Sequence, residues 1–251
     1  VPYIKDISFT GYQTEFRRSA GDGFGRSGSN YATTVIAGNT FDYPYVHGEA
    51  IADAGLGFVS ASAGAVENGD VRLTDYNTVD LILGKQRRTV TGTGKSGIRF
   101  HTFPTALKNA LRQFSDKGGH LIVSGQYVAS SLTDMRSDAE DRTFAAEILG
   151  VTSTESDLRR SGRVRLPSGK NAGYSATLND RQYIVEAPDI LQPAEGADTE
   201  TILTFSDTGT IAGIRHDRGG KRGDVTVLSI PVESLLDAAV RWQLMKSLLR
   251  Q

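Results

Sequence analysis

The chain has 251 residues and a formal net charge of −1, with 38% hydrophobic and 23% charged residues. This composition is typical of a soluble globular protein, and the near-zero charge excludes a global field that would attract nucleic acid or an anionic membrane. The absence of cysteine excludes disulfides, thiolate metal sites and cysteine nucleophiles. No apolar run approaches the roughly 18 residues that a membrane span needs, so none is expected.

The chain begins at Val1 with neither a methionine nor a signal peptide. We therefore interpret the sequence as a piece of a larger protein or as a mature form left by processing. Its length allows one large α/β domain, and we expect a single domain over 1–251.

The first third of the chain alternates strand-like and helix-like segments. The segment 1–32 is polar and glycine-rich, and we interpret it as a mobile loop that comes after a short strand near 3–7. The run at 33–38 predicts a buried strand. A helix is expected next, because Val46, Ala50, Ile51 and Ala54 share one helical face. Two further strands are predicted at 57–62 and 78–84, and the second is apolar enough to need cover on both faces.

The middle of the chain continues the alternation. A helix is predicted at about 105–117, since Leu107, Ala110, Leu111 and Phe114 are spaced i, i+3, i+4 and i+7. A strand follows at 120–125, and then a helix at about 138–149. Ser137 and Glu140 form a candidate capping box for that second helix.

From 151 to 225 short β-like runs are separated by turn residues, which predicts hairpins. These runs cover 162–166, 182–187, 199–206 and 210–216. A buried strand at 225–230 and an amphipathic helix at about 234–250 close the chain. This order predicts a parallel sheet with helices on both faces, interrupted by a β-rich insertion at about 151–225.

Three glycine motifs resemble nucleotide-binding signatures without their context. G-x-G-x-x-G occurs at 23–28 and at 92–97, but neither copy follows a strand and opens a helix, as pyrophosphate binding requires. Gly94-Lys95-Ser96 imitates the end of a P-loop, but Thr89 stands where the first glycine is needed. The histidines at 47, 101, 120 and 216 show no metal-type spacing, so no cofactor or metal is expected.

Two strand ends are candidate ligand sites. In a parallel α/β sheet, ligands lie at the carboxyl ends of the strands, and backbone N–H groups at glycine turns can hold an anion. The candidate ligand-binding residues after the two strands are Gly84, Lys85, Gln86, Gly125, Gln126 and Tyr127.

Several stretches resemble the class I glutamine amidotransferase-like superfamily. They are "YNTVDLILGKQ", "ALKNALRQFSDKGG", "HLIVSGQYVA" and "GDVTVLSIPVESLLDAAVRWQLMKSLL", and the likeness covers about 33–150 and 210–251. More narrowly, "AGNTFDYPYVHGEAIADAGLGFVSASAGAVENGDVRL" resembles the amidotransferase-like region of large secreted Bacteroidetes proteins described as xanthan lyases. The resemblance implies a three-layer, flavodoxin-like α/β fold.

The chain departs from this family at the catalytic turn. Active members carry a cysteine there, partnered by a histidine and an acid, whereas the matching turn here is Gly125-Gln126. Cysteine-dependent amidotransferase chemistry is therefore excluded.

A serine or tyrosine could replace the cysteine. Ser124, Ser130 and Ser131 flank the turn, and His216 with Asp217, or His47 with Glu49, could supply a base and its orienting acid. The G-x-S-x-G elbow is absent. A polysaccharide lyase would use a base such as Tyr127 or His216 with Arg215 at the substrate carboxylate, but no spacing selects these residues. The candidate catalytic residues are Ser124, Tyr127, His216 and His47.

We expect a non-catalytic amidotransferase-like module of a larger exported protein. Its role would be ligand binding or domain assembly, linked to polysaccharide or cell-envelope metabolism. A lyase resembling xanthan lyase, or a serine hydrolase, remains the alternative. The expected partners are neighbouring domains and a carbohydrate, without nucleic acid.

Overall fold

The computed structural model describes residues 43–87, 89–90, 98–135, 137–156, 161–177 and 184–249. The strands predicted near 3–7 and at 33–38, and both G-x-G-x-x-G motifs, lie outside the described residues.

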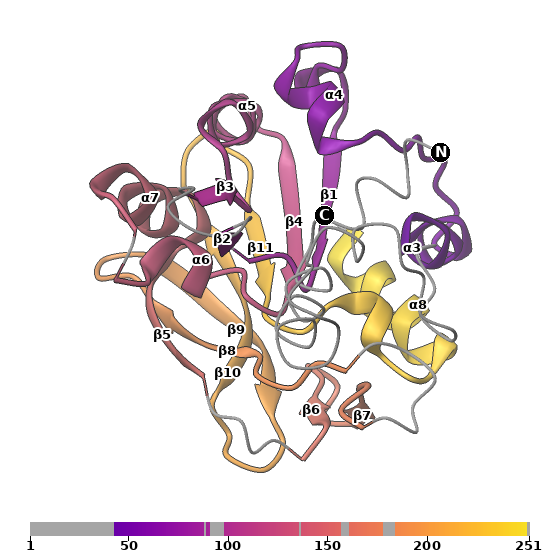
Figure 1. Cartoon of the computed structure of the whole chain (residues 1–251). Helices are drawn as coiled ribbons and strands as arrows, with labels where there is room; N and C mark the ends of the chain where they lie inside the picture. Colours follow the sequence, from indigo (N-terminus) through magenta and orange to yellow (C-terminus); the bar gives the residue numbers. More distant parts are fainter. Residues whose placement is uncertain are drawn as a thin grey trace, which may run out of the picture.

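A mixed seven-stranded sheet, curled into a half-barrel, forms the centre of the molecule (Figure 1). The strand order is β1-β4-β11-β10-β9-β6-β7, and within this sheet the parallel neighbours are β1 with β4 and β4 with β11. Their bounds are Thr78–Gly84, His120–Gly125 and Val225–Leu228. The antiparallel strands are β10 (Ile211–Asp217), β9 (Asp198–Phe205), β6 (Arg163–Arg165) and β7 (Asn171–Gly173).

The expected α/β class is confirmed, but the expected parallel sheet holds for only three strands. The β-rich segment does not decorate the sheet, because four of its strands extend it from the β11 edge. Short turns join β9 to β10 and β6 to β7, and a short turn can connect only antiparallel neighbours. Two small sheets complete the strands: β2 (Thr89–Val90) with β3 (Ile98–Phe100), and β5 (Val151–Ser156) with β8 (Asp189–Pro193).

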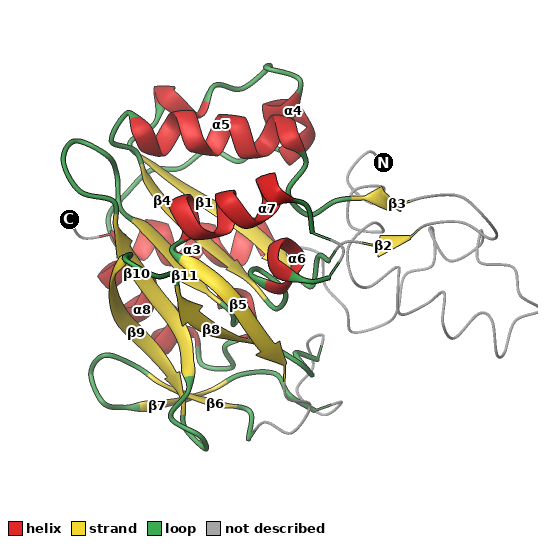
Figure 2. Ribbon diagram, turned by 90° about the vertical axis from the view of Figure 1, so that its left-hand side faces the viewer, coloured by secondary structure: helices red, strands yellow, loops and turns green. Residues whose placement is uncertain are grey.

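Helices cover both faces of the parallel strands (Figure 2). On one face lie α5 (Thr105–Asp116), α7 (Ala139–Phe144) and the π-helical turn η3 (Ala145–Leu149); on the other lie α3 (Tyr43–Asp53) and α8 (Ala238–Leu249). Strand β4 serves both faces, because Leu121 and Val123 join one hydrophobic cluster while Ile122 joins the other. Short helices are α4 (Ala63–Glu67), η2 (Leu73–Asp75), α6 (Ser130–Thr133) and η5 (Val232–Ser234).

Three local predictions are wrong. The segment 57–62 is a loop, with Phe58 50% and Val59 69% exposed. The helix cap at α7 is Asp138, whose carboxylate accepts the Asp141 N–H, because Ser137 instead donates to Asp134. Residues 184–187, in the strand predicted at 182–187, form a loop.

Candidate functional site

The turn after β4 is held by backbone hydrogen bonds from two directions. The Gln126 N–H donates to the Gly84 carbonyl at 2.8 Å, and the Gln126 carbonyl accepts the Asp189 N–H at 3.0 Å. Gly84 and Gly125 are also register partners in the β1–β4 pair. The two strand ends singled out from the sequence therefore adjoin, and β8 lies against the turn.

The side chains at this edge are buried and mostly engaged. Gln126 is fully buried, and neither its amide nitrogen nor its amide oxygen has a hydrogen-bond partner among the described residues. Lys85, 7% exposed, donates to the Glu186 carboxylate at 2.7 Å. The Arg87 guanidinium lies 4.9 Å from the centre of the half-buried Tyr127 ring.

The carboxylate of Asp189, which is distant in sequence, stabilises the start of α6 next to the same turn. Asp189 accepts the backbone N–H groups of Ala129 at 2.9 Å and Ser130 at 2.8 Å. Gln86, half-buried, bonds through its N–H to the Leu83 carbonyl at 2.8 Å. This scaffold orders the turn without presenting a nucleophile on it.

The structure assembles a buried charged group that the sequence did not predict, the His47 cluster of His47, Asp80 and Glu233. His47 Nδ1 is 2.6 Å from Asp80 Oδ2, and Nε2 is 3.1 Å from Glu233 Oε2. The cluster ties α3 to β1 and to η5. The sequence contained one signal of this cluster, namely Asp80, which is the one charged residue in the apolar run "TVDLILG".

The His47 cluster fixes a proton on the imidazole ring. Burial alone would lower the pKa, but the charge of Asp80 and hydrogen bonds to Asp80 and Glu233 outweigh it and raise the pKa of His47 to about 10. The ring is therefore cationic at neutral pH, with both nitrogens facing carboxylates. In this state it cannot accept a proton from a nucleophile.

The acid–histidine pairs anticipated from the sequence are not formed. Glu49 accepts a hydrogen bond from the Tyr45 hydroxyl at 2.7 Å instead of orienting His47. His216 Nδ1 bonds to the Ile148 carbonyl at 3.2 Å, while Asp217 accepts the Gly219 N–H. Burial lowers the pKa of His216, so its ring is neutral at pH 7.

Ser124 stands alone on β4. The Ser124 hydroxyl is buried and has no hydrogen-bond partner within the part of the chain that the structure describes. No histidine in the described part of the chain is hydrogen-bonded to a serine, threonine or tyrosine hydroxyl. Among these residues there is also no group of three side chains suited to holding a metal ion. Nor does any described helix combine the length and apolarity needed to cross a bilayer.

Comparisons with known proteins return structural likenesses at low identity. No model of a known protein family matches the chain, and neither does any curated protein. Gan42B, a GH42 β-galactosidase from G. stearothermophilus, matches with a TM-score of 0.50 at 12% identity over 88% of this chain and 28% of that chain. An exo-β-1,4-mannosidase from Opitutaceae bacterium strain TAV5 matches at TM-score 0.37 and 15% identity, over 57% of this chain and 22% of that one.

A ThuA-like protein from Bacteroides uniformis is a further structural neighbour. It matches at TM-score 0.43 and 13% identity, over 82% of this chain and 84% of its own. The chain spans only 22% and 28% of the lengths of the two glycosidases. The likeness to Gan42B supports the α/β fold and no more.

Proposed function

We propose that this chain is a non-catalytic, amidotransferase-like module of a larger exported protein, with a flavodoxin-like core. Its role is to bind a ligand or to support domain assembly in a protein that acts on polysaccharide or cell-envelope material. The observation that carries the proposal is the His47 cluster. His47, one of the two histidines considered as a catalytic base, is held as a cation between two buried carboxylates.

The turn after β4 also favours binding over catalysis. Its position matches the nucleophile turn of the resembling family, yet it carries Gly125 and Gln126. The Gln126 amide has two donors and an acceptor without partners, a costly arrangement that a bound polar ligand would relieve. Lys85 follows the adjoining strand end, and it would neutralise an anionic part of that ligand by exchanging its present partner Glu186 for it.

The surroundings of the module are proposed from the glycosidase likenesses. Gan42B is named a β-galactosidase, and this chain corresponds to 28% of its length. A segment of about this share of a longer chain is compatible with a module that accompanies a separate catalytic domain. This likeness supports our proposal that the chain is part of a carbohydrate-active protein.

An activity screen with site variants tests the non-catalytic assignment. The chain is incubated with neutral and acidic polysaccharides and with chromogenic esters, alongside Ser124→Ala, Tyr127→Phe and His216→Gln variants. We expect no turnover above background from any of the four proteins. Turnover that one of these substitutions abolishes would establish a lyase or hydrolase and end the proposal.

The binding role is tested at the strand ends. Lys85→Gln and Gln126→Met should each weaken retention of the chain in polysaccharide affinity gels. Lys117→Gln is the matched control, since Lys117 is exposed after α5, at the opposite end of β4. Equal retention of all these proteins would exclude the strand ends as the ligand site.

A further inference from the structure

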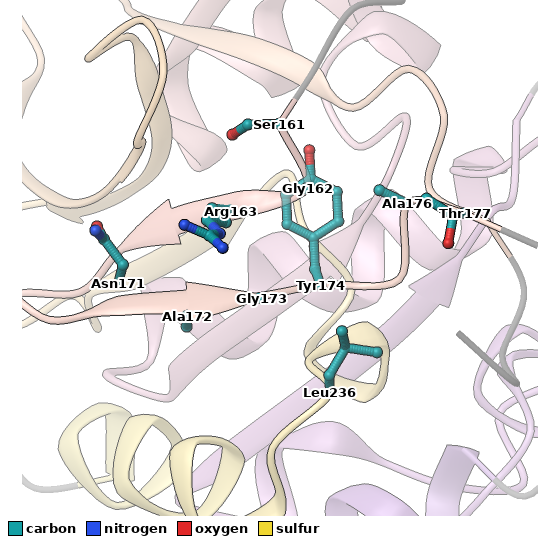
Figure 3. A pocket seen from close by; sticks show the side chains of 10 residues that line it. All are labelled: Ser161, Gly162, Arg163, Asn171, Ala172, Gly173, Tyr174, Ala176, Thr177 and Leu236. Carbon is teal, nitrogen blue, oxygen red and sulfur yellow. The ribbon is translucent and has the colours of Figure 1, made fainter. Parts of the chain in front are cut away.

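A pocket of about 500 Å³ lies at the far edge of the sheet from the β4 turn (Figure 3). The β6–β7 hairpin forms one side of this hairpin pocket, and Leu236, between η5 and α8, forms another. Its walls include Ser161, Arg163, Asn171, Gly173, Tyr174 and Leu236. The volume is within the range of small-molecule sites.

Small residues keep the hairpin pocket open. Gly173 is the cross-strand partner of Arg163, so no side chain stands opposite the guanidinium. A Cβ atom at Gly173 would lie 3.4 Å from the Leu236 side chain. Gly162, with φ of +71°, brings the chain so close to Ala176 that a Cβ there would be 2.8 Å from the alanine methyl. Gly173 therefore leaves space beside Leu236 that a larger side chain would fill, whereas Gly162 allows the close approach of the chain to Ala176 at the pocket wall.

Cationic side chains outnumber carboxylates at the hairpin pocket, where Asp207 accepts the backbone N–H of the lining residue Ser161. Residues 161–173 include Arg163, Arg165 and Lys170 and no carboxylate. Arg163 is exposed and forms no ion pair with the described part of the chain, whereas the buried Lys85, Lys108 and Arg218 all do. The guanidinium is thus available to an anion.

Neutral polar groups surround this cation. Asn171 accepts a hydrogen bond from Ser206 at 3.0 Å through its carbonyl oxygen, which leaves its amide N–H groups as donors. The backbone N–H of Ser161 donates to Asp207, so its side-chain hydroxyl is not used in that contact. In Figure 3 the polar ends of Ser161, Arg163 and Asn171 lie around the pocket.

We propose that the hairpin pocket binds a hydroxyl-rich carboxylate of sugar-acid size. The Arg163 guanidinium pairs with the carboxylate in a charge-assisted contact. Asn171 and Ser161 hydrogen-bond the hydroxyls, and Leu236 contacts the carbon skeleton. This site is separate from the β4 turn, so the inference stands independently of the function proposed above.

Calorimetric titration with D-galacturonate and D-galactose tests the site, because the two sugars differ in the carboxylate at one carbon. We expect galacturonate to bind at least about tenfold more tightly than galactose, as a charged hydrogen bond implies. Arg163→Gln should remove that preference. Lys117→Gln is the matched control, since it removes one positive charge at an exposed residue after α5, outside the pocket walls.

A second variant separates shape from charge. Gly173→Val adds bulk beside Leu236 without altering charge, and it should weaken galacturonate binding about tenfold or more. Lys85→Gln should leave this binding unchanged, which distinguishes the hairpin pocket from the β4 turn. Equal losses in Arg163→Gln and Lys117→Gln, binding of inorganic phosphate as tight as that of galacturonate, or no galacturonate binding by the wild type would each overturn the proposal.

Discussion

His47 should lose its proton at a much higher pH than a solvent-exposed histidine does. Its pKa is raised to about 10, whereas burial lowers the pKa of both His120 and His216. We expect nitrogen NMR spectra of the imidazole rings at pH 8 to show His47 as imidazolium and the other two as neutral rings. A neutral His47 at pH 8 would contradict the role assigned to Asp80 and Glu233.

The same pKa difference makes stability depend on pH. The folded-state value of about 10 exceeds the ordinary 6.5, so between these values the folded chain holds a proton that the unfolded chain has released. The stabilisation is fully present below about pH 6.5, falls as pH rises, and is lost above about pH 10. Urea unfolding from pH 6.5 to 10 should show this decline in the wild type and a smaller one in His47→Gln.

The loss in His47→Gln should be large at pH 6.5, about 3–5 kcal/mol, because two buried carboxylates would remain without their cation. His101→Gln is the control, since His101 is exposed. A His47→Gln variant that tracks the wild type at every pH would show that the cluster contributes nothing to stability.

The buried amide of Gln126 should destabilise the fold, in contrast to the stabilising His47 cluster. Its amide is fully buried and has no hydrogen-bond partner among the described residues. The free-energy cost of removing this amide from water is therefore not compensated by a hydrogen bond. Gln126→Met keeps the approximate volume and should raise the free energy of unfolding by about 1–3 kcal/mol. Thermal and urea unfolding measure the change. Destabilisation by this substitution would mean that the amide makes a stabilising contact in solution.

At the level of elements, the amino end of β11 depends on two glycines meeting. Gly223 lies against the backbone of Gly119, where any Cβ would collide with the Gly119 carbonyl group. Its N–H donates to the Ser115 carbonyl at 2.7 Å, which holds β11 to the end of α5.

Gly223→Ala should therefore lower the free energy of unfolding by about 2 kcal/mol or more, because backbone and not a flexible side chain must move. Gly57→Ala is the matched control, since nothing lies within 4 Å of its Cβ position and its φ is not positive. Equal stability of the two variants would show that the β11 end adjusts freely.

Elements with strong local patterns were predictable from the sequence, and those set by distant contacts were not. The strands at 78–84 and 120–125 have the expected bounds, and α5 buries Leu107, Leu111 and Phe114 as its spacing predicts. The segment 57–62 has the composition of a strand, but the Phe58 ring lies against Gly48 of α3 and no described strand pairs with it. Strand composition indicates compatibility with a sheet and does not supply a partner.

In the candidate site, too, the local features were predictable from the sequence and the contacts between distant residues were not. The Gly84 and Gly125 ends adjoin as expected, since parallel neighbours end at one edge. Glu186, which pairs with Lys85, comes from 101 residues further along the chain, and Glu233 reaches His47 from 186 residues away. Only the folded chain brings such groups together, which is why sequence reasoning assigned Glu49 as the partner of His47.

At the scale of the whole molecule, β4 links the two hydrophobic clusters. Leu121 packs toward α5 and α7, while the next residue, Ile122, packs toward α3 and α8. If the cluster on one face of the sheet came apart, β4 would no longer be held in place for the cluster on the other face. The described domain should therefore unfold as one unit.

The single tryptophan allows a test of this cooperativity. Trp242 lies on α8 beside the cluster that contains Ile122, so its fluorescence reports that face, while far-ultraviolet circular dichroism reports all elements. Leu121→Ala and Ile122→Ala should each cost about 2–5 kcal/mol and shift both signals together in urea. Met135→Ala, at a fully exposed residue, should shift neither. If Leu121→Ala moves the dichroism curve and leaves the fluorescence curve in place, the two faces unfold separately, and β4 does not couple them.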